Sequence, residues 1–150
     1  MGDPKKLKKK YSTPVHPWNK TEIDKNKILR KEYGLRNRRE LLIFDSFLKK
    51  YKDIAKTLIA NETVQGKREK KQMMDKLEKL GLISPGAELD SVLSLESKDV
   101  LERRLQSVVF RKGLARTINQ SRQFITHRHI VVGDKEITAP SYIISIEEEN

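Results

Sequence analysis

The sequence contains no cysteine. This absence excludes a disulfide framework, a catalytic thiol and a cysteine-based zinc site, and it fits a reducing compartment. Histidine is scarce too, and His16, His127 and His129 are too few and too unevenly spaced to form a zinc site of their own. We therefore expect neither a metal ion nor a cofactor.

Long apolar stretches are also absent. No run approaches the roughly 18 to 20 residues that span a bilayer, and no apolar signal-peptide segment follows the basic N-terminus. Aromatic residues make up 6% of the chain, and its single tryptophan, Trp18, lies in a proline-rich stretch, which disfavours a basic helix on a membrane surface. The expectation is a soluble cytoplasmic protein without a membrane partner.

Positive charge, in contrast, is abundant. Thirty-two Lys and Arg residues outnumber 21 Asp and Glu residues, which gives a net charge of +11 and favours a polyanionic partner such as nucleic acid. The charge is uneven: +8 over residues 1–40, +4 over 41–80, −3 over 81–100, +5 over 101–137 and −3 over 138–150. Two basic blocks around an acidic spacer predict two contact surfaces joined by a non-contacting connection.

The N-terminal half reads as an arm followed by helices. Residues 1–18 contain five lysines and three prolines without periodicity, which predicts an extended basic arm. A helical domain is expected over residues 19–83. Its first helix is capped by Asn19 or Thr21 and ended by Gly34, and its third covers about residues 67–80. The long middle helix starts behind Asn37, and its inward face is predicted to consist of Leu41, Phe44, Leu48, Tyr51, Ala55 and Leu58.

The C-terminal third predicts helices and strands together. Residues 84–97 are turn-rich and acidic, and they are the candidate junction. In residues 98–150 a helix over about 98–112, capped by Ser97, precedes a second over 118–126, whose start carries a Thr117–Gln120 capping box. The stretches HIVV, EIT and YIISIE then have strand character. The predicted fold class is α+β, with two helices packed on a small sheet behind a helical unit.

Basic side chains recur at the helix ends of this third. Arg104 and Arg111 are seven residues apart and are expected to share a helix face, while Arg122 lies one turn behind the elbow at Thr117. Together with the free amides of that helix start they would form a concave phosphate site, for which the planar fork of arginine is well suited. The alternative is that each charge merely lies on a solvated helix face. Packing or polar contacts are a simpler role for the two histidines than catalysis.

These residues also match a known pattern. The segments LERRLQSVVFRKGLARTINQSRQFITHRHIVV and APSYIISI resemble, over residues 101–146, the RNA-binding domain named after small-subunit ribosomal protein S-four, also called the alpha-L motif. The segments KKYSTPVHPW, YGLRNRREL and LDSVLSLESKDVLERRLQ resemble the arm, helix start and junction of archaeal and eukaryotic members of that ribosomal family. Relatives usually continue past SIEEEN with one more strand, which suggests that the chain has lost an end.

The resemblance implies a structural, non-enzymatic protein that binds small-subunit rRNA directly and early in assembly. It further implies a place beside ribosomal protein S-five and other small-subunit proteins near the mRNA entrance, with a bearing on decoding accuracy and with mRNA as a further partner. No small-molecule substrate is expected. The alternatives are a pseudouridine synthase or a ribosome-rescue factor that uses the same domain.

The candidate RNA-binding residues follow from both arguments, and none is expected to be catalytic or to bind metal. The hairpin tip is turned by Gly133 and Asp134, and Glu136 stands where basic residues are common, so strong RNA contact by the tip is not expected. The full set is Lys8, Lys9, Lys10, Arg36, Arg38, Arg39, Arg104, Arg111, Lys112, Arg116, Thr117, Gln120, Arg122, Gln123, His127, Arg128 and Lys135.

Overall fold

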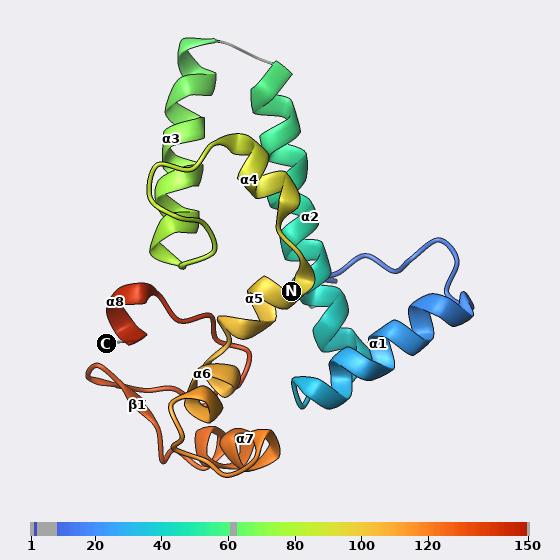
Figure 1. The fold of residues 1–150 in the computed structure, drawn as a ribbon, viewed down its shortest axis with the longest axis vertical. Coiled ribbons are helices and arrows are strands. Elements are labelled where there is room, and N and C mark those ends of the chain that lie inside the picture. Colours follow the sequence, from blue (N-terminus) through green and yellow to red (C-terminus); the bar gives the residue numbers. More distant parts are fainter. Residues whose placement is uncertain (1, 3–8, 61–62, 150) are drawn as a thin grey trace.

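A computed structural model describes Gly2 and residues 9–60 and 63–149. This part of the chain is mostly helical with one small antiparallel sheet, which confirms the predicted α+β class (Figure 1). A long helix, α2 (Arg38–Ala60), forms the axis of the N-terminal half. Helix α3 (Val64–Lys79) runs beside it, and α1 (Lys20–Glu32) crosses near its start. The C-terminal unit lies at the other end of the molecule from the last turn of α2 and the first turn of α3.

The boundaries of α1 are those that the sequence predicts. The Asn19 side chain accepts a hydrogen bond from the Thr21 amide at 3.1 Å, and Gly34 adopts the left-handed conformation (φ 57°) that ends the helix. Helix α3 begins earlier than predicted, because Thr63 caps it by accepting a hydrogen bond from the Gly66 amide at 3.0 Å. Gly81, at φ 67°, follows its end as expected.

Helix α2 supplies the centre of the N-terminal core. All six of its predicted inward residues are buried, so the helical spacing identified the core face correctly. Met73 and Leu77 of α3 are buried in the same cluster. Burial of these side chains stabilises the helices more than their own propensity can.

The predicted junction contains a helix that the sequence pattern did not predict. Helix α4 (Leu89–Ser94) buries Leu89 and Val92 against α2, so this acidic stretch contributes to the core. The next helix, α5 (Ser97–Glu102), is capped by Glu96 in a capping box with Asp99, which corrects the expected cap at Ser97. The Ser97 hydroxyl instead donates to the Asp45 carboxylate at 2.6 Å. The division of the chain into domains at 84–97 remains a proposal.

The single helix predicted over residues 98–112 is broken in two. Between α5 and α6 (Leu105–Arg111) the chain is extended at Arg104 (φ −70°, ψ 143°), and Arg104 forms an isolated antiparallel bridge with Ile143. The Ile144 amide donates to Arg103 O at 3.0 Å and the Leu105 amide donates to Tyr142 O at 2.7 Å. The stretch predicted as a third strand therefore pairs with this break, and no third strand forms within the described chain.

The remaining elements complete the C-terminal unit. Helix α7 (Ile118–Thr126) has the predicted bounds and packs against α6. Strands β1 (Val131–Val132) and β2 (Lys135–Glu136) form a short hairpin, and the end of YIISIE enters a last helical turn, α8 (Ile146–Glu149), instead of a strand.

Two separate hydrophobic clusters support the two halves. The first extends from Tyr33 to Leu101 along the chain, and the second from Leu105 to Ile144. The change of cluster coincides with the break at Arg103 and Arg104, so polar contacts have a large part in joining the halves. Across residues 2, 9–60 and 63–149, none of the helices combines the length and apolarity required to cross a bilayer.

Candidate nucleic-acid interface

The elbow between α6 and α7 presents basic and polar side chains to solvent. Gly113 turns the chain at φ 73°, and the Thr117 hydroxyl accepts a hydrogen bond from the Gln120 amide at 3.2 Å, which fixes the start of α7. The Gln120 side chain accepts from the Arg116 amide at 2.8 Å. The predicted capping box is thus half right. The bond from the Gln120 amide to Thr117 is present, but the Gln120 side chain accepts from the Arg116 amide rather than from the Thr117 amide. The arrangement holds the backbone from which the exposed Arg116 side chain projects.

The far end of α7 forms a second exposed corner. Arg128 adopts a left-handed conformation (φ 63°), and its amide and that of His129 donate to the last carbonyls of α7 at 3.1 Å and 2.9 Å. The His127 and His129 rings stack at 6.4 Å, and His129 meets Phe124 edge-on at 5.9 Å. These contacts agree with a packing role for the histidines. No cluster suited to holding a metal ion is found among the described residues.

The predicted RNA-binding residues differ in the exposure of their side chains. Arg38, Gln120 and Arg122 are half-buried. The side chains that are exposed are Lys9, Lys10, Arg36, Arg39, Arg111, Lys112, Arg116, Thr117, Gln123, His127, Arg128 and Lys135. Lys135 stands on the hairpin opposite Val132 and beside the exposed Glu136, so the tip carries charge of both signs.

The arm contacts α2 through Tyr11, Ser12 and Pro17. The Tyr11 ring lies under Lys9 Nζ at 4.7 Å and under the guanidinium of Arg39 at 5.4 Å. Arg38 Nη1 donates to Pro17 O at 3.4 Å, and the Ser12 amide donates to the Ser46 hydroxyl at 3.0 Å. Residues 9–17 of the arm and the basic start of α2 therefore lie against each other. Lys8, also predicted, lies outside the described residues.

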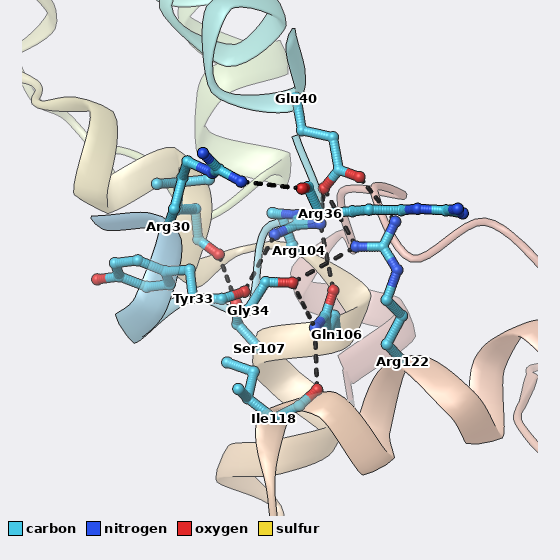
Figure 2. Close-up of polar contacts among 11 residues, drawn as sticks. Arg30, Tyr33, Gly34, Arg36, Glu40, Arg104, Gln106, Ser107, Ile118 and Arg122 are labelled. Carbon is cyan, nitrogen blue, oxygen red and sulfur yellow. Dashed lines mark hydrogen bonds and ion pairs between the residues drawn. The ribbon is translucent and has the colours of Figure 1, made fainter. Parts of the chain in front are cut away.

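A carboxylate lies at the centre of this region. Glu40 Oε1 accepts from Arg122 Nη2 at 2.7 Å, while Oε2 accepts from Arg122 Nη1 at 3.2 Å and from Arg104 Nη2 at 3.3 Å (Figure 2). Arg122 belongs to α7, and Arg104 lies at the break before α6. One acidic side chain of α2 therefore binds two arginines of the C-terminal unit. Such bidentate pairs are directional as well as charged.

Backbone carbonyls of the loop between α1 and α2 complete the network. Gly34 O accepts from Gln106 Nε2 at 3.3 Å and from Arg122 Nη1 at 3.5 Å, and the same Gln106 nitrogen donates to Ile118 O at 2.9 Å (Figure 2). Arg30 Nη2 holds Arg36 O at 3.0 Å. The loop that carries the exposed Arg36 is thus fixed on both sides.

Arg104 is placed differently from the sequence prediction. Its side chain is fully buried (0% exposed), and it also donates to Tyr33 O at 3.5 Å and lies over the Phe44 ring at 5.3 Å. Burial lowers the pKa of Arg104 to about 10, against the opposing effect of Glu40. The expectation that Arg104 and Arg111 share a helix face is wrong, because the chain breaks before α6. Arg104 therefore joins the two halves of the molecule and does not present its charge to solvent.

The basic end of α6 is partly occupied by the last helical turn. Arg111 Nη2 donates to Glu149 Oε1 at 2.7 Å, Lys112 Nζ donates to the Glu149 carbonyl, and Arg103 donates to the other carboxylate oxygen. Burial tends to raise the pKa of Glu149, but hydrogen bonds from Arg103 and Arg111 outweigh it and hold the pKa below its usual range. The Glu149 carboxylate thus already occupies this part of the predicted phosphate site.

Sequence reasoning missed Glu40 and Gln106. The position of Glu40 could have drawn attention to it, since an acidic residue directly follows the basic run of Arg36, Arg38 and Arg39. Gln106 lies between the apolar Leu105 and Val108 of α6, and a buried amide requires partners. Neither signal identifies the partner, which comes from the other half of the chain.

Comparison with known proteins agrees with this architecture. The family model of the S4 domain matches residues 103–150. The full chain is 47% identical to the small ribosomal subunit protein uS4 of Saccharolobus solfataricus and covers 83% of it. It is 48% identical to the protein of the same name from Methanococcus maripaludis and covers 85% of that protein. The similarity therefore extends through the arm, the helical unit and the C-terminal unit.

Proposed function

Because the chain belongs to the uS4 family of small ribosomal subunit proteins, we propose that it is a structural, non-enzymatic component of that subunit which binds small-subunit rRNA. One observation carries the proposal: exposed basic side chains lie on both of the halves that a single ion-pair network at Glu40 joins. Arg36 and Arg39 come from the N-terminal half, and Arg116 and Arg128 from the C-terminal half.

The proposed contacts are mainly to phosphate. Exposed arginine forks bind phosphate oxygens bidentately, and Thr117 and Gln123 add neutral hydrogen-bonding groups beside them. Arg122 is half-buried and paired with Glu40, so we propose RNA contact first for its exposed neighbours. Arg104 is left out of the proposed contact set because it is buried. Helical RNA is bound largely through shape and backbone, which such a surface suits.

We further propose the finer role that the family resemblance implies. It comprises binding early in subunit assembly, a position beside ribosomal protein S-five near the mRNA entrance, and an influence on decoding accuracy. The cytoplasm is the corresponding location. Identity over the full chain to uS4 proteins supports this role, and the residues of the arm and of the 34–39 loop are the ones to test for it.

The test is binding to small-subunit rRNA fragments and to unrelated RNA of equal length over a range of salt concentrations. We expect a preference for the rRNA and a log K that falls with log salt by about 0.9 for each duplex phosphate that is neutralised. Arg116→Glu should weaken binding more than Lys70→Glu, which changes the charge equally on α3. A salt-insensitive affinity, or equal affinity for both RNAs, contradicts the proposal.

Co-sedimentation distinguishes this function from rescue of stalled large subunits. The proposal requires the protein in the small-subunit peak after a moderate salt wash, and recovery in the large-subunit peak contradicts it.

A further inference from the structure

Glu40 is an acidic residue at the centre of a surface proposed to bind a polyanion. Its side chain is 19% exposed, and its two oxygens bind Arg122 and Arg104 at 2.7 to 3.3 Å. Considered by charge alone, a carboxylate at this place opposes RNA binding. Its contacts suggest the reverse, because all of its ion-pair partners come from the other half of the chain.

Apart from Ile143, which packs against the N-terminal hydrophobic cluster, and the contacts of Arg103 with Ile144 and Glu149, polar contacts around Glu40 fix the relative orientation of the two halves. Their hydrophobic clusters are separate, and the extensive helix pairs lie within one half or the other, apart from the consecutive α5 and α6. Polar contacts cross between the halves instead: Tyr33 and Gly34 accept from Arg104 and Gln106, and Glu40 accepts from Arg104 and Arg122. Because ion pairs and hydrogen bonds are directional, this network defines one orientation.

The orientation matters because each half carries its own basic surface. Arg36 follows Gly34 by two residues in the N-terminal half. In the C-terminal half Arg116 precedes α7, and Gln123 lies on α7 next to Arg122. Two surfaces that are held at a fixed spacing can bind one folded ligand at the same time. If the surfaces reorient freely, part of the binding free energy is lost in ordering them.

We propose that Glu40 is a positioning residue for RNA binding: by holding Arg122 and Arg104 it fixes the two basic surfaces in the arrangement that a folded RNA requires. The inference rests on the proposed function and adds a role for a residue that does not itself contact RNA. By charge alone, removal of the Glu40 carboxylate should strengthen RNA binding, whereas this inference requires that it weaken specific binding.

The experiment compares full-length wild type, Glu40→Gln and Glu22→Gln, a control with the same charge change at an exposed residue of α1. Each protein is titrated with a multi-helix junction fragment of small-subunit rRNA and with poly(U) of equal length. For Glu40→Gln we expect about tenfold weaker binding to the junction, which is a part of the gain that linking two surfaces can give, and unchanged or tighter binding to poly(U). Glu22→Gln should not weaken either.

Two further measurements separate positioning from folding. Circular dichroism on heating reports whether Glu40→Gln remains folded. Glu40→Asp retains the charge but shortens its reach, so it serves as the decisive variant if Glu40→Gln unfolds. Residual dipolar couplings of amides in α2 and α7 should show that the two helices lose their common orientation in either folded variant.

The outcomes are distinct. Equal or tighter binding of both RNAs by the folded variant overturns the inference, as does an equal loss for both RNAs. If wild type itself does not prefer the rRNA junction, the proposed function fails. If wild type shows the preference and Glu40→Gln retains it, the positioning role alone fails.

Discussion

The backbone of Gly34 lies directly against the side chain of Gln106. Gln106 Nε2 donates to Gly34 O at 3.3 Å, and a methyl group on Gly34 would lie 2.8 Å from that nitrogen and 2.9 Å from the Ile118 side chain. Gly34 also has a φ of 57°, a region that other residues rarely adopt. A glycine is thus required here both to end α1 and to let two halves of the chain approach.

Gly34→Ala should therefore destabilise the protein through two effects. The left-handed conformation costs about 1 kcal/mol for alanine, and the overlap with Gln106 and Ile118 adds about 1 to 2 kcal/mol. Gly86→Ala is the matched control, because Gly86 has a φ of 76° but no atom within 4 Å of the added methyl group. Urea unfolding of both variants measures the difference, and equal losses would show that the close approach is unimportant.

Arg104 should not tolerate lysine. The guanidinium reaches Glu40, Gln106 and Tyr33 O together, and one ammonium group on a flexible stem cannot reproduce that geometry. We expect Arg104→Lys to lower the free energy of unfolding by about 2 kcal/mol, because a buried network loses partners. Arg111→Lys is the control: its side chain is 50% exposed, and a change within about 0.5 kcal/mol is expected. Similar losses in the two variants would contradict the role assigned to burial.

The sequence predicted the parts of the fold that depend on local periodicity. The inward face of α2 and the bounds of α7 were correct because apolar spacing and capping residues act within one helix. The break at Arg103 and Arg104 was missed, because it depends on backbone pairing with Tyr142 and Ile144, about 40 residues along the chain. The tertiary contact overrides a local pattern that reads as one continuous helix.

The candidate site shows the same limit. Charge and the family resemblance placed Arg104 in the same RNA-binding set as Arg116, so they did not distinguish a buried arginine from an exposed one. That distinction depends on Glu40, 64 residues away from Arg104. Long-range ion pairs leave no periodic signature in a single sequence, so the network at Glu40 emerged from the structure alone.

Asp45 gives the protein a pH-dependent element in the N-terminal half. Burial raises the pKa of Asp45, and the hydrogen bond from the Ser97 hydroxyl only partly opposes this effect. An unfolded aspartate titrates near 3.9, so between that pH and the raised pKa the folded state binds more protons than the unfolded state. The penalty for the buried charge is therefore full at neutral pH and disappears as the pH falls.

Asp45→Asn should consequently be at least as stable as wild type at pH 7, since the amide oxygen can still accept from Ser97. The advantage should shrink as the pH falls through the raised pKa toward about 4. Chemical denaturation at a series of pH values measures this, with Asp53→Asn on the exposed side of α2 as the control. A variant that loses stability at pH 7 and regains none in acid would show that the ionised carboxylate is favourable here.

Glu149 should limit the RNA affinity of the elbow. It engages Arg103, Arg111 and Lys112, two of which belong to the proposed phosphate-binding set. In Glu149→Gln the carboxylate charge is gone, so Arg111 becomes available to a phosphate. We expect tighter binding of small-subunit rRNA and a salt slope steeper by about 0.9 for each additional phosphate that the protein neutralises.

Glu147→Gln provides the comparison, because it removes the same charge from an exposed residue of the same helical turn. A general reduction of negative charge would raise the affinity of both variants equally and leave the slopes alike. Release of Arg111 predicts a larger increase in affinity for Glu149→Gln, and combining it with Arg111→Gln should abolish that excess. If the excess persists in the double variant, the increase does not come from Arg111.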